Sequence, residues 1–292
     1  MNDNEFVHVD DVVAQLLYRI DTNKGNDAFC PGVYTGFKDL DAYTGGLQRG
    51  ELILVGARPS MGKTSFALSL ARNLSIRSDK CVVFFSLEQT KEQLVSRIVS
   101  TEARIDCMHI LKGNLKDDEY IRLSECIDMI KGSHFLIDDT PNITADEITS
   151  RCVAYNSNSD IDLVIIDYYQ LIKHVADWPD NKPDIMAELK SLARMIDAPV
   201  MVLSQVSRKT DLREDHRPQL TDFMDLFSID QYADTILFLY RDDYYNKDSD
   251  HRGSMDVTIA KQNSGPCGLI RLSWIPEYAD FKDYVRNGTC TG

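Results

Sequence analysis

The chain has 292 residues, of which 43% are hydrophobic and 27% charged, and this composition excludes wholesale disorder. Its 46 acidic and 32 basic residues give a net charge of −14, so a nucleic acid can be bound only at a local basic site and not by the surface as a whole. The length suffices for one large domain or two small ones.

No segment predicts export or membrane insertion. The N-terminus is acidic and polar and lacks the basic start and apolar core of a signal peptide, and apolar runs such as Leu163 to Ile166 are too short to cross a bilayer. Seven cysteines are scattered without a C-x-x-C pair, which indicates neither a disulfide framework nor a zinc site. We therefore expect a cytoplasmic protein with no membrane partner.

The first predicted element is an amphipathic helix over residues 9–22. Its apolar residues recur at helical spacing, at Val12, Val13, Leu16, Leu17 and Ile20. A polar stretch with glycine and proline follows and is typical of a linker. A single helix on a linker buries little surface, so it either folds back on its own domain or docks on a partner.

From about residue 50, strands and helices alternate. Apolar runs at 52–55, 82–85, 135–137, 163–166 and 200–203 are separated by helix-like segments near 63–77, 91–104, 118–131, 145–155 and 184–196. Two helices open with capping boxes, Thr90-x-x-Gln93 and Thr144-x-x-Glu147. Continuously apolar strands are buried on both faces, which predicts an α/β fold with a mostly parallel central sheet. Runs at 235–240, 255–260 and 269–274 predict antiparallel strands added at one edge.

Residues 51–65, ELILVGARPSMGKTS, pass from a strand through a turn into a helix and match the Walker A phosphate loop, with Ala57 in the place of the usual first glycine. Gly62 lets the backbone approach phosphates, Lys63 can reach the β- and γ-phosphates, and the Thr64 hydroxyl can ligate Mg²⁺. We predict nucleotide contacts from Ala57, Ser60, Met61, Gly62, Lys63, Thr64 and Ser65.

Polar residues follow three further predicted strands. Asp167 ends the run LVIID, at the edge where an open α/β sheet binds its ligand, and is predicted to hold Mg²⁺ through water. Glu88 is a candidate for polarising the attacking water, or else an exposed loop acid. Gln205 suits a γ-phosphate sensor, or else a polar loop residue. Three such side chains at three strand ends point to one phosphate site.

Six segments carry a resemblance from about Thr35 to Phe281: GARPSMGKTSFALSLA, FSLEQTKEQLVSR, FLIDDTP, LVIIDYYQL, PVMVLSQVSR and IDQYADTILFLYRDDYY. In order and spacing they resemble the ATPase domain of DnaB-type replicative helicases. The resemblance implies a RecA-like P-loop NTPase core over residues 33–292, preceded by a linker helix and connector over residues 1–32. It also implies ATP-driven translocation on single-stranded DNA by a ring-shaped homo-hexamer.

Carried over by this resemblance, Lys63 and Thr64 bind ATP phosphates and Mg²⁺, Glu88 is the catalytic base, Asp167 the Walker B acid and Gln205 the sensor. Arg97 resembles a nucleotide-contacting arginine, and Lys261 the lysine of a Lys-x-Arg pair that reaches the neighbouring subunit's γ-phosphate. Helix 9–22 resembles the linker helix that docks on the next subunit of the ring.

The chain also departs from the family pattern. The arginine-finger position is Asn263, so efficient hydrolysis would need a substitute such as Arg252 or Arg271. In the DNA-facing loop an arginine has become Met224 and a glycine Phe227, which removes a phosphate-pairing charge. Residues 1–34 leave no room for the helical domain that usually recruits primase, although a primase or a helicase loader remains a candidate partner.

A basic cluster follows the predicted strand at 200–203. Its members, Arg208, Lys209, Arg213 and Arg217, correspond to family loops that line the central channel. Acidic residues are interleaved, so the alternative is a mixed-charge solvated loop. Phe227 can stack on a base or pack in the core, and Trp178 can contact a partner or pack in its loop.

Three functions remain open at this point. The first is an ATP-dependent DNA helicase motor. The second is a nucleotide-binding ring or helicase-interaction protein with impaired hydrolysis, which Asn263 and Met224 favour. The third is a recombinase-like filament former. The linker helix and the SLE and DYYQL segments argue against it.

Overall fold

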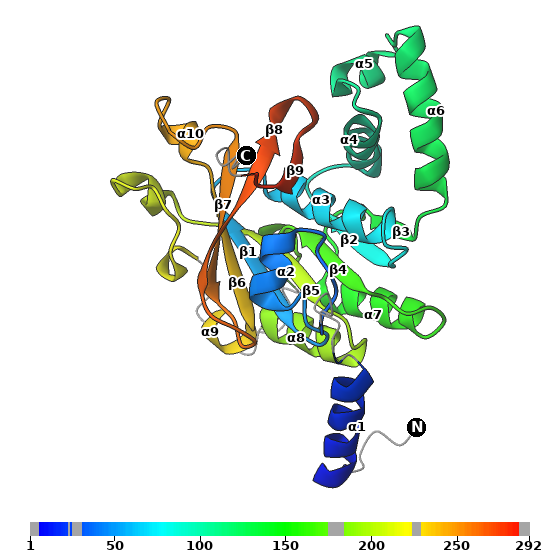
Figure 1. Cartoon of the computed structure of the whole chain (residues 1–292), viewed down its shortest axis with the longest axis vertical. Coiled ribbons are helices and arrows are strands. Elements are labelled where there is room, and N and C mark those ends of the chain that lie inside the picture. The colour runs from blue at the N-terminus through cyan, green and yellow to red at the C-terminus, as the bar shows by residue number, and fades with distance from the viewer. Residues whose placement is uncertain (1–5, 23, 25–30, 175–183, 224–228, 286–292) are drawn as a thin grey trace, which may run out of the picture. The chain divides into compact units, whose positions relative to one another are not determined.

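A computed structural model of the chain describes residues 6–22, 24, 31–174, 184–223 and 229–285 (Figure 1). It divides into two compact units, residues 1–31 and residues 32–292. The first unit contains α1 (Val9–Thr22), which confirms the helix predicted there. Its apolar side chains at Val12, Val13, Leu16 and Leu17 are exposed. No helix within the described ranges is long and apolar enough to cross a membrane.

The second unit is built on one nine-stranded sheet of described residues, in the order β3-β2-β4-β5-β1-β6-β7-β8-β9. Strands β1 to β6 pair in parallel and β7 to β9 pair antiparallel, which confirms the predicted mixed sheet. The strands are β1 (Leu52–Ala57), β2 (Val82–Ser86), β3 (Phe135–Asp138), β4 (Leu163–Asp167), β5 (Val200–Gln205), β6 (Thr235–Tyr240), β7 (Ser254–Lys261), β8 (Gly268–Ile275) and β9 (Asp280–Asp283).

One predicted strand direction was wrong. The run 235–240 was expected to be antiparallel to its neighbours, but β6 lies parallel to β1, with Ile53 opposite Thr235, and only its other side is antiparallel, to β7. The reason lies in the connection before it. The residues from 206 to 234 are numerous enough for a crossover, which a parallel pair requires, whereas β7, β8 and β9 follow one another through short connections.

Helices cover both faces of the sheet (Figure 1). Alternate residues of β1 enter opposite clusters: Ile53 and Val55 pack with α3, and Leu52 and Leu54 pack with α7 and α8. The five predicted helices are confirmed to within two residues at each end, as α3 (Lys63–Ser75), α4 (Lys91–Ala103), α6 (Asp117–Lys131), α7 (Ala145–Asn156) and α8 (Ile185–Met195). Both predicted capping boxes are present.

Shorter elements were not predicted. They are α2 (Lys38–Thr44), α5 (Cys107–Lys112), α9 (Ile229–Tyr232), α10 (Asp242–Tyr245) and the 3₁₀ turns η1 (Tyr169–Leu171), η2 (Arg208–Leu212), η3 (Leu220–Asp222) and η4 (Pro276–Tyr278). The final strand, β9, was also missed. It is only four residues long and reads Asp-Phe-Lys-Asp, so neither its length nor its composition sets it apart from a loop.

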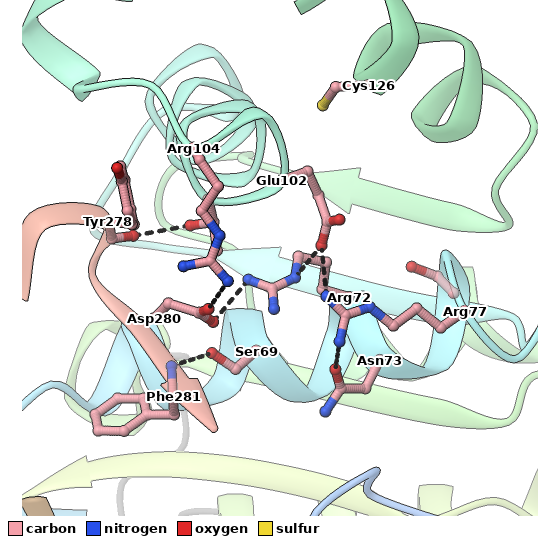
Figure 2. A network of polar contacts seen from close by, with 12 residues as sticks. Ser69, Arg72, Asn73, Arg77, Glu102, Arg104, Cys126, Tyr278, Asp280 and Phe281 are labelled. Carbon is pink, nitrogen blue, oxygen red and sulfur yellow. Dashed lines mark hydrogen bonds and ion pairs between the residues drawn. The ribbon is translucent and has the colours of Figure 1, made fainter. Parts of the chain in front are cut away.

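A buried polar network fixes β9 against α3 and α4 (Figure 2). Asp280 accepts hydrogen bonds from Arg72 Nη1 at 2.9 Å and from Arg104 Nη2 at 3.2 Å. The side chain of Arg72 is 4% exposed and that of Asp280 is fully buried, and Arg72 also pairs with Glu102. Since ions this deeply buried must be paired, the network fixes how the C-terminal hairpin lies over α3.

Candidate functional site

The sheet brings the predicted phosphate-binding segments to one edge. Ala57 at the end of β1 lies opposite Gln205 at the end of β5, and Ser86 at the end of β2 lies opposite Asp167 at the end of β4. Since all four strands run in the same direction, the segments that follow them meet at the carboxyl edge, where open α/β sheets bind ligands.

The loop between β1 and α3 is shaped by two residues with left-handed backbone. Ser60 has φ 66° and Gly62, directly before α3, has φ 93°. A Cβ atom at Gly62 would also lie 3.2 Å from Phe281 Cζ, so glycine meets both a conformational and a steric requirement. The first N–H groups of α3 consequently point into the loop, where they can bind an anion.

An open cavity of about 420 Å³ lies over this loop. Eight of the predicted site residues line it: Ser60, Gly62, Lys63, Thr64, Ser65, Glu88, Arg97 and Gln205. Ala57 and Met61 do not line it, because their side chains are buried in the core beneath the loop and support its conformation. Glu88 is exposed, as expected of a residue at the mouth of the site.

Among the predicted site residues that the structure describes, Lys63 and Asp167 have the most strongly shifted pKa values. Lys63 Nζ donates to the Ala57 carbonyl at 3.2 Å, and burial lowers its pKa to about 8. Asp167 is 1% exposed, and burial raises the pKa of its carboxyl to about 6. Both groups are held in an environment that penalises their charged forms, and an anion and a cation, respectively, would relieve that penalty.

The donor set fits Mg²⁺. Thr64 Oγ1 donates to Asp167 Oδ2 at 2.7 Å, while the buried Oδ1 atom of Asp167 makes no hydrogen bond to any residue that the structure describes. A buried carboxylate oxygen without a partner is costly in a folded protein. A hydroxyl and a carboxylate are the oxygen ligands that Mg²⁺ takes beside phosphates and water, so these two residues can hold it.

Arg97 is anchored at the cavity wall by neutral partners. Its guanidinium donates to Ser65 Oγ at 2.6 Å and to Gln89 Oε1 at 3.1 Å. Burial lowers the pKa of Arg97, since desolvation outweighs the attraction of Asp167. A cation that is partly buried and bonded mainly to neutral groups is available to a phosphate.

Gln205 is oriented by Gln170, which the sequence did not single out. The N–H of Gln205 donates to Gln170 Oε1 at 3.2 Å, and Gln170 Nε2 donates to the Gln205 carbonyl at 3.2 Å and to Ser204 Oγ at 2.9 Å. The sensor candidate therefore leaves β5 on a main chain fixed by the segment that follows β4.

Four cavity residues were missed: Pro59, Gln89, Trp274 and Ala279. Pro59 and Gln89 adjoin motif residues, so proximity in sequence could have found them. Trp274 comes from β8, where its ring lies 4.6 Å from that of Phe281 and the Arg241 guanidinium lies 5.1 Å from its centre. No local signal relates Trp274 to a phosphate loop about 200 residues earlier.

Lys261 does not lie near this cavity. It pairs with Ile236 at the start of β6, at the amino edge of the parallel strands, and donates to the Ala233 carbonyl at 2.7 Å. Asn263, exposed nearby, donates to Asp234 Oδ1 at 3.3 Å. The two edges are separated by the length of a six-residue strand, roughly 20 Å. Within one chain, Lys261 therefore cannot reach the phosphate loop.

The four predicted DNA-binding cations fall into two groups. Arg208 and Lys209 are exposed on η2. Arg213 pairs with the buried Asp222, its Nη1 lying 3.1 Å from Oδ1, and Arg217 donates to the buried Asp256 at 2.7 Å. Two of the four cations therefore stabilise the loop from within.

Two further expectations concern other residues. Arg271, considered as a substitute for the missing arginine finger, also donates to Asp256, at 2.7 Å, so it is engaged in the same internal cluster. Arg252 is exposed and lies 3.7 Å from Asp248. Met224, Phe227 and Trp178 lie outside the described residues.

A largely parallel sheet, a phosphate loop and a buried acid at the end of a neighbouring strand define a P-loop nucleotide-binding protein with a RecA-like core. Residues 32–283 match the family described as the DnaB-like helicase C terminal domain, and the chain belongs to this family. The resemblance found in the sequence is thus confirmed.

Two named relatives are similar to the chain over most of its length. The chain is 39% identical over 289 residues to the replicative DNA helicase DnaC of Bacillus subtilis (strain 168), covering 98% of this chain and 64% of that protein. It is 38% identical over 285 residues to the replicative DNA helicase DnaB of Geobacillus stearothermophilus, covering 96% and 63%. The chain thus spans somewhat less than two thirds of the length of these relatives.

Solved structures match throughout the chain. A solved ATPase domain superposes with a TM-score of 0.89 and 34% identity, covering 96% of this chain and all of the other. A DnaB-like replicative helicase, solved in a study of its interactions with primase, superposes with a TM-score of 0.85 and 34% identity, covering 98% and 69%.

Proposed function

We propose that the chain is the motor of a replicative DNA helicase, which hydrolyses ATP to translocate on single-stranded DNA. The observation that carries this proposal is the contact between Thr64 and Asp167 beneath the phosphate loop, with one Asp167 oxygen left without a partner among the described residues. A buried acid poised in this way suits a metal-assisted phosphoryl transfer, which simple nucleotide storage does not need.

Each side chain has one role in the proposed reaction. Lys63 and the N–H groups of the loop bind the β- and γ-phosphates of ATP, and Thr64 and Asp167 hold Mg²⁺, which when bound neutralises charge on the phosphate oxygens. Glu88 accepts the proton of the water that attacks the γ-phosphorus. The bond from the γ-phosphorus to the bridging oxygen breaks, ADP and phosphate leave, and Gln205 senses the γ-phosphate.

Two features support the proposal that the chain assembles into a homo-hexamer. The apolar side chains of α1 are exposed, and docking on a neighbouring subunit would bury them. Lys261 lies at the edge opposite the cavity, where it can face the cavity of the next subunit. In this proposal residues 1–32 are the linker helix and connector, and residues 33–292 are the ATPase domain.

The proposed DNA contact is modest in each subunit. Arg208 and Lys209 are the exposed cations of the basic cluster, and a ring repeats them around its channel. Repetition on one strand converts weak contacts into a usable affinity by raising the effective concentration of each successive site. The match to a helicase solved in a study of its interactions with primase makes primase a candidate partner, and a helicase loader is another.

A second function is favoured by one observation. The arginine-finger position is Asn263, whose amide donates to Asp234 and carries no charge to a neighbour's nucleotide. A DnaB-like ring that binds nucleotide with impaired hydrolysis, and that modulates another helicase, would have this feature.

ATP hydrolysis by protein of known oligomeric state, with and without single-stranded DNA, separates the two functions. The motor predicts hydrolysis that DNA stimulates and that both Lys63→Ala and Glu88→Gln abolish. Closed rings that bind ATP but hydrolyse none with any single strand would refute the motor and leave the binding ring. Filaments instead of rings would point to a recombinase-like assembly.

A further inference from the structure

The phosphate loop and the start of the basic loop are joined through one carbonyl oxygen. The oxygen of Ala57 accepts from Lys63 Nζ at 3.2 Å and from the N–H of Val206 at 3.2 Å. Val206 directly follows Gln205, which lines the cavity. The phosphate-binding ammonium and the segment that leads to the exposed cations therefore share an acceptor.

Arg58 strengthens this connection. It directly follows Ala57, and its Nη1 donates to the Val206 carbonyl at 3.2 Å. Its Nε and Nη2 donate to the two oxygens of Asp211, at 3.2 and 2.7 Å. This two-pronged pair fixes direction as well as distance, and the Arg58 side chain is 15% exposed while that of Asp211 is 37% exposed, so solvent screens the pair in part.

Asp211 lies on η2, two residues beyond Lys209, and has a second anchor. The hydroxyl of Tyr245 donates to Asp211 Oδ1 at 2.8 Å, and the Tyr245 ring stacks on that of His216 with 4.3 Å between centres. Hydrogen bonds from Arg58 lower the pKa of Asp211, so the carboxylate is charged at neutral pH. The turn that presents Arg208 and Lys209 is thereby fixed to the phosphate loop.

We propose that Asp211 is a positioning residue that couples nucleotide binding to single-stranded DNA binding, through its paired hydrogen bonds with Arg58. A nucleotide that displaces the phosphate loop moves Arg58, and Arg58 moves the turn that carries Arg208 and Lys209. The inference rests on the proposed function, since it takes these two cations as the DNA contact. By linkage, DNA must strengthen nucleotide binding by the same factor by which nucleotide strengthens DNA binding.

The test measures this factor. The affinity of the assembled full chain for a fluorescein-labelled oligothymidylate is measured by anisotropy, with and without a non-hydrolysable ATP analogue and Mg²⁺. We expect the analogue to change the wild-type affinity at least about 5-fold. In Asp211→Asn the factor falls to about 1, while binding of a fluorescent ATP analogue without DNA stays close to wild type.

Glu214→Gln is the matched control. Glu214 is an exposed carboxylate of the same loop, so its substitution removes the same charge and is expected to leave the coupling factor unchanged. Arg58→Gln should lose the factor as Asp211→Asn does, and the double variant should lose no more than either single variant. Asp211→Glu, which keeps the charge, should retain part of the factor and guards against misfolding of the amide variant.

The outcomes are distinguishable. If Asp211→Asn, folded as judged by its Tm, keeps the wild-type coupling factor, the inference is wrong and the proposed function stands. A wild-type factor of 1 with intact DNA binding also overturns the inference alone. A wild-type ring that binds no oligothymidylate in either state overturns both, and only the wild-type arm is needed to reveal it.

Discussion

Thr64 Oγ1 and Asp167 Oδ2 lie 2.7 Å apart and join the start of α3 to the end of β4. The contact uses one oxygen of a carboxylate that is almost completely buried, and the other oxygen is bonded to no described residue. The hydroxyl and the carboxylate are thus adjacent, and in the proposed site a metal ion would bind to them with little reorganisation.

Removing the Thr64 hydroxyl tests this contact. Thr64→Ala should weaken the Mg²⁺-dependent part of ADP binding by about 10- to 100-fold, because it deletes a ligand and also leaves Asp167 without its hydroxyl donor. A fluorescent ADP analogue titrated with and without Mg²⁺ measures the effect. Thr64→Ser keeps the hydroxyl and is expected to bind as wild type, whereas equal Mg²⁺ dependence in all three proteins would contradict the assignment.

The affinity for nucleotide should depend on pH and should decrease below about pH 6 and above about pH 8. Asp167 has a raised pKa of about 6, so it becomes protonated and loses its metal-binding charge as the pH falls below 6. Lys63 has a lowered pKa of about 8, so it loses its ammonium charge as the pH rises above 8. Affinity for the Mg²⁺ complex of ADP is therefore expected to be highest between these values.

Omitting Mg²⁺ is the control for the acidic limb. Without the metal, ionised Asp167 only repels the phosphates, so its protonation below pH 6 should strengthen binding instead of weakening it. The alkaline limb should be present in both series. A profile whose acidic limb is the same with and without Mg²⁺ would exclude Asp167 as its cause.

Asn263→Arg should increase DNA-stimulated hydrolysis. In the proposed ring, a guanidinium at this position would reach the γ-phosphate of a neighbour and stabilise the charge that develops there, an effect worth several orders of magnitude in P-loop enzymes. We expect a gain in kcat of at least about tenfold. Asn263→Lys adds charge without the planar fork and should gain less. An unchanged rate in the arginine variant would mean that no trans cation is missing here.

Asp280→Asn should destabilise the folded unit of residues 32–292. The substitution leaves Arg72 and Arg104 facing a neutral amide in a site where Asp280 is fully buried, and breaking such a pair costs about 3–5 kcal/mol. Chemical unfolding measures the change. Asp248→Asn removes a fully exposed partner of Arg252 and should leave the unfolding midpoint where it is. Equal stability of the two variants would contradict the role given to the network.

The sequence predicts this fold well where the signal is local. Apolar runs bounded by turns locate the buried strands, and the capping box at Thr90 and Gln93 marks where α4 begins. The direction of β6 depends instead on the path of the chain between 206 and 234, which no local pattern encodes. The hairpin that carries Trp274 to the cavity is likewise placed by tertiary contacts, such as that of Arg72 with Asp280.

The candidate site also has a part that the sequence predicts and a part that it does not. The phosphate loop is predictable, because its residues are adjacent and each has a chemical reason to be there. The exposure of the individual cations in the basic cluster is not predictable, because a run of cations does not reveal which of them pairs with a buried carboxylate. Arg213 pairs with Asp222 and Arg217 with Asp256 only in the folded chain. Arg208 and Lys209 are the two cations of the cluster that are exposed.

The cavity and Lys261 lie at opposite edges of one sheet, and this separation constrains how copies of the chain can associate. A contact that places Lys261 of one copy against the cavity of the next joins two different surfaces, and the interface is heterologous when each copy gives these two surfaces to two different neighbours. Such a heterologous interface always leaves one unused surface at each end of a growing assembly. A pure rotation that closes after a whole number of copies occupies every one of these surfaces and gives a ring. The same contact with a small axial rise would give an open helix.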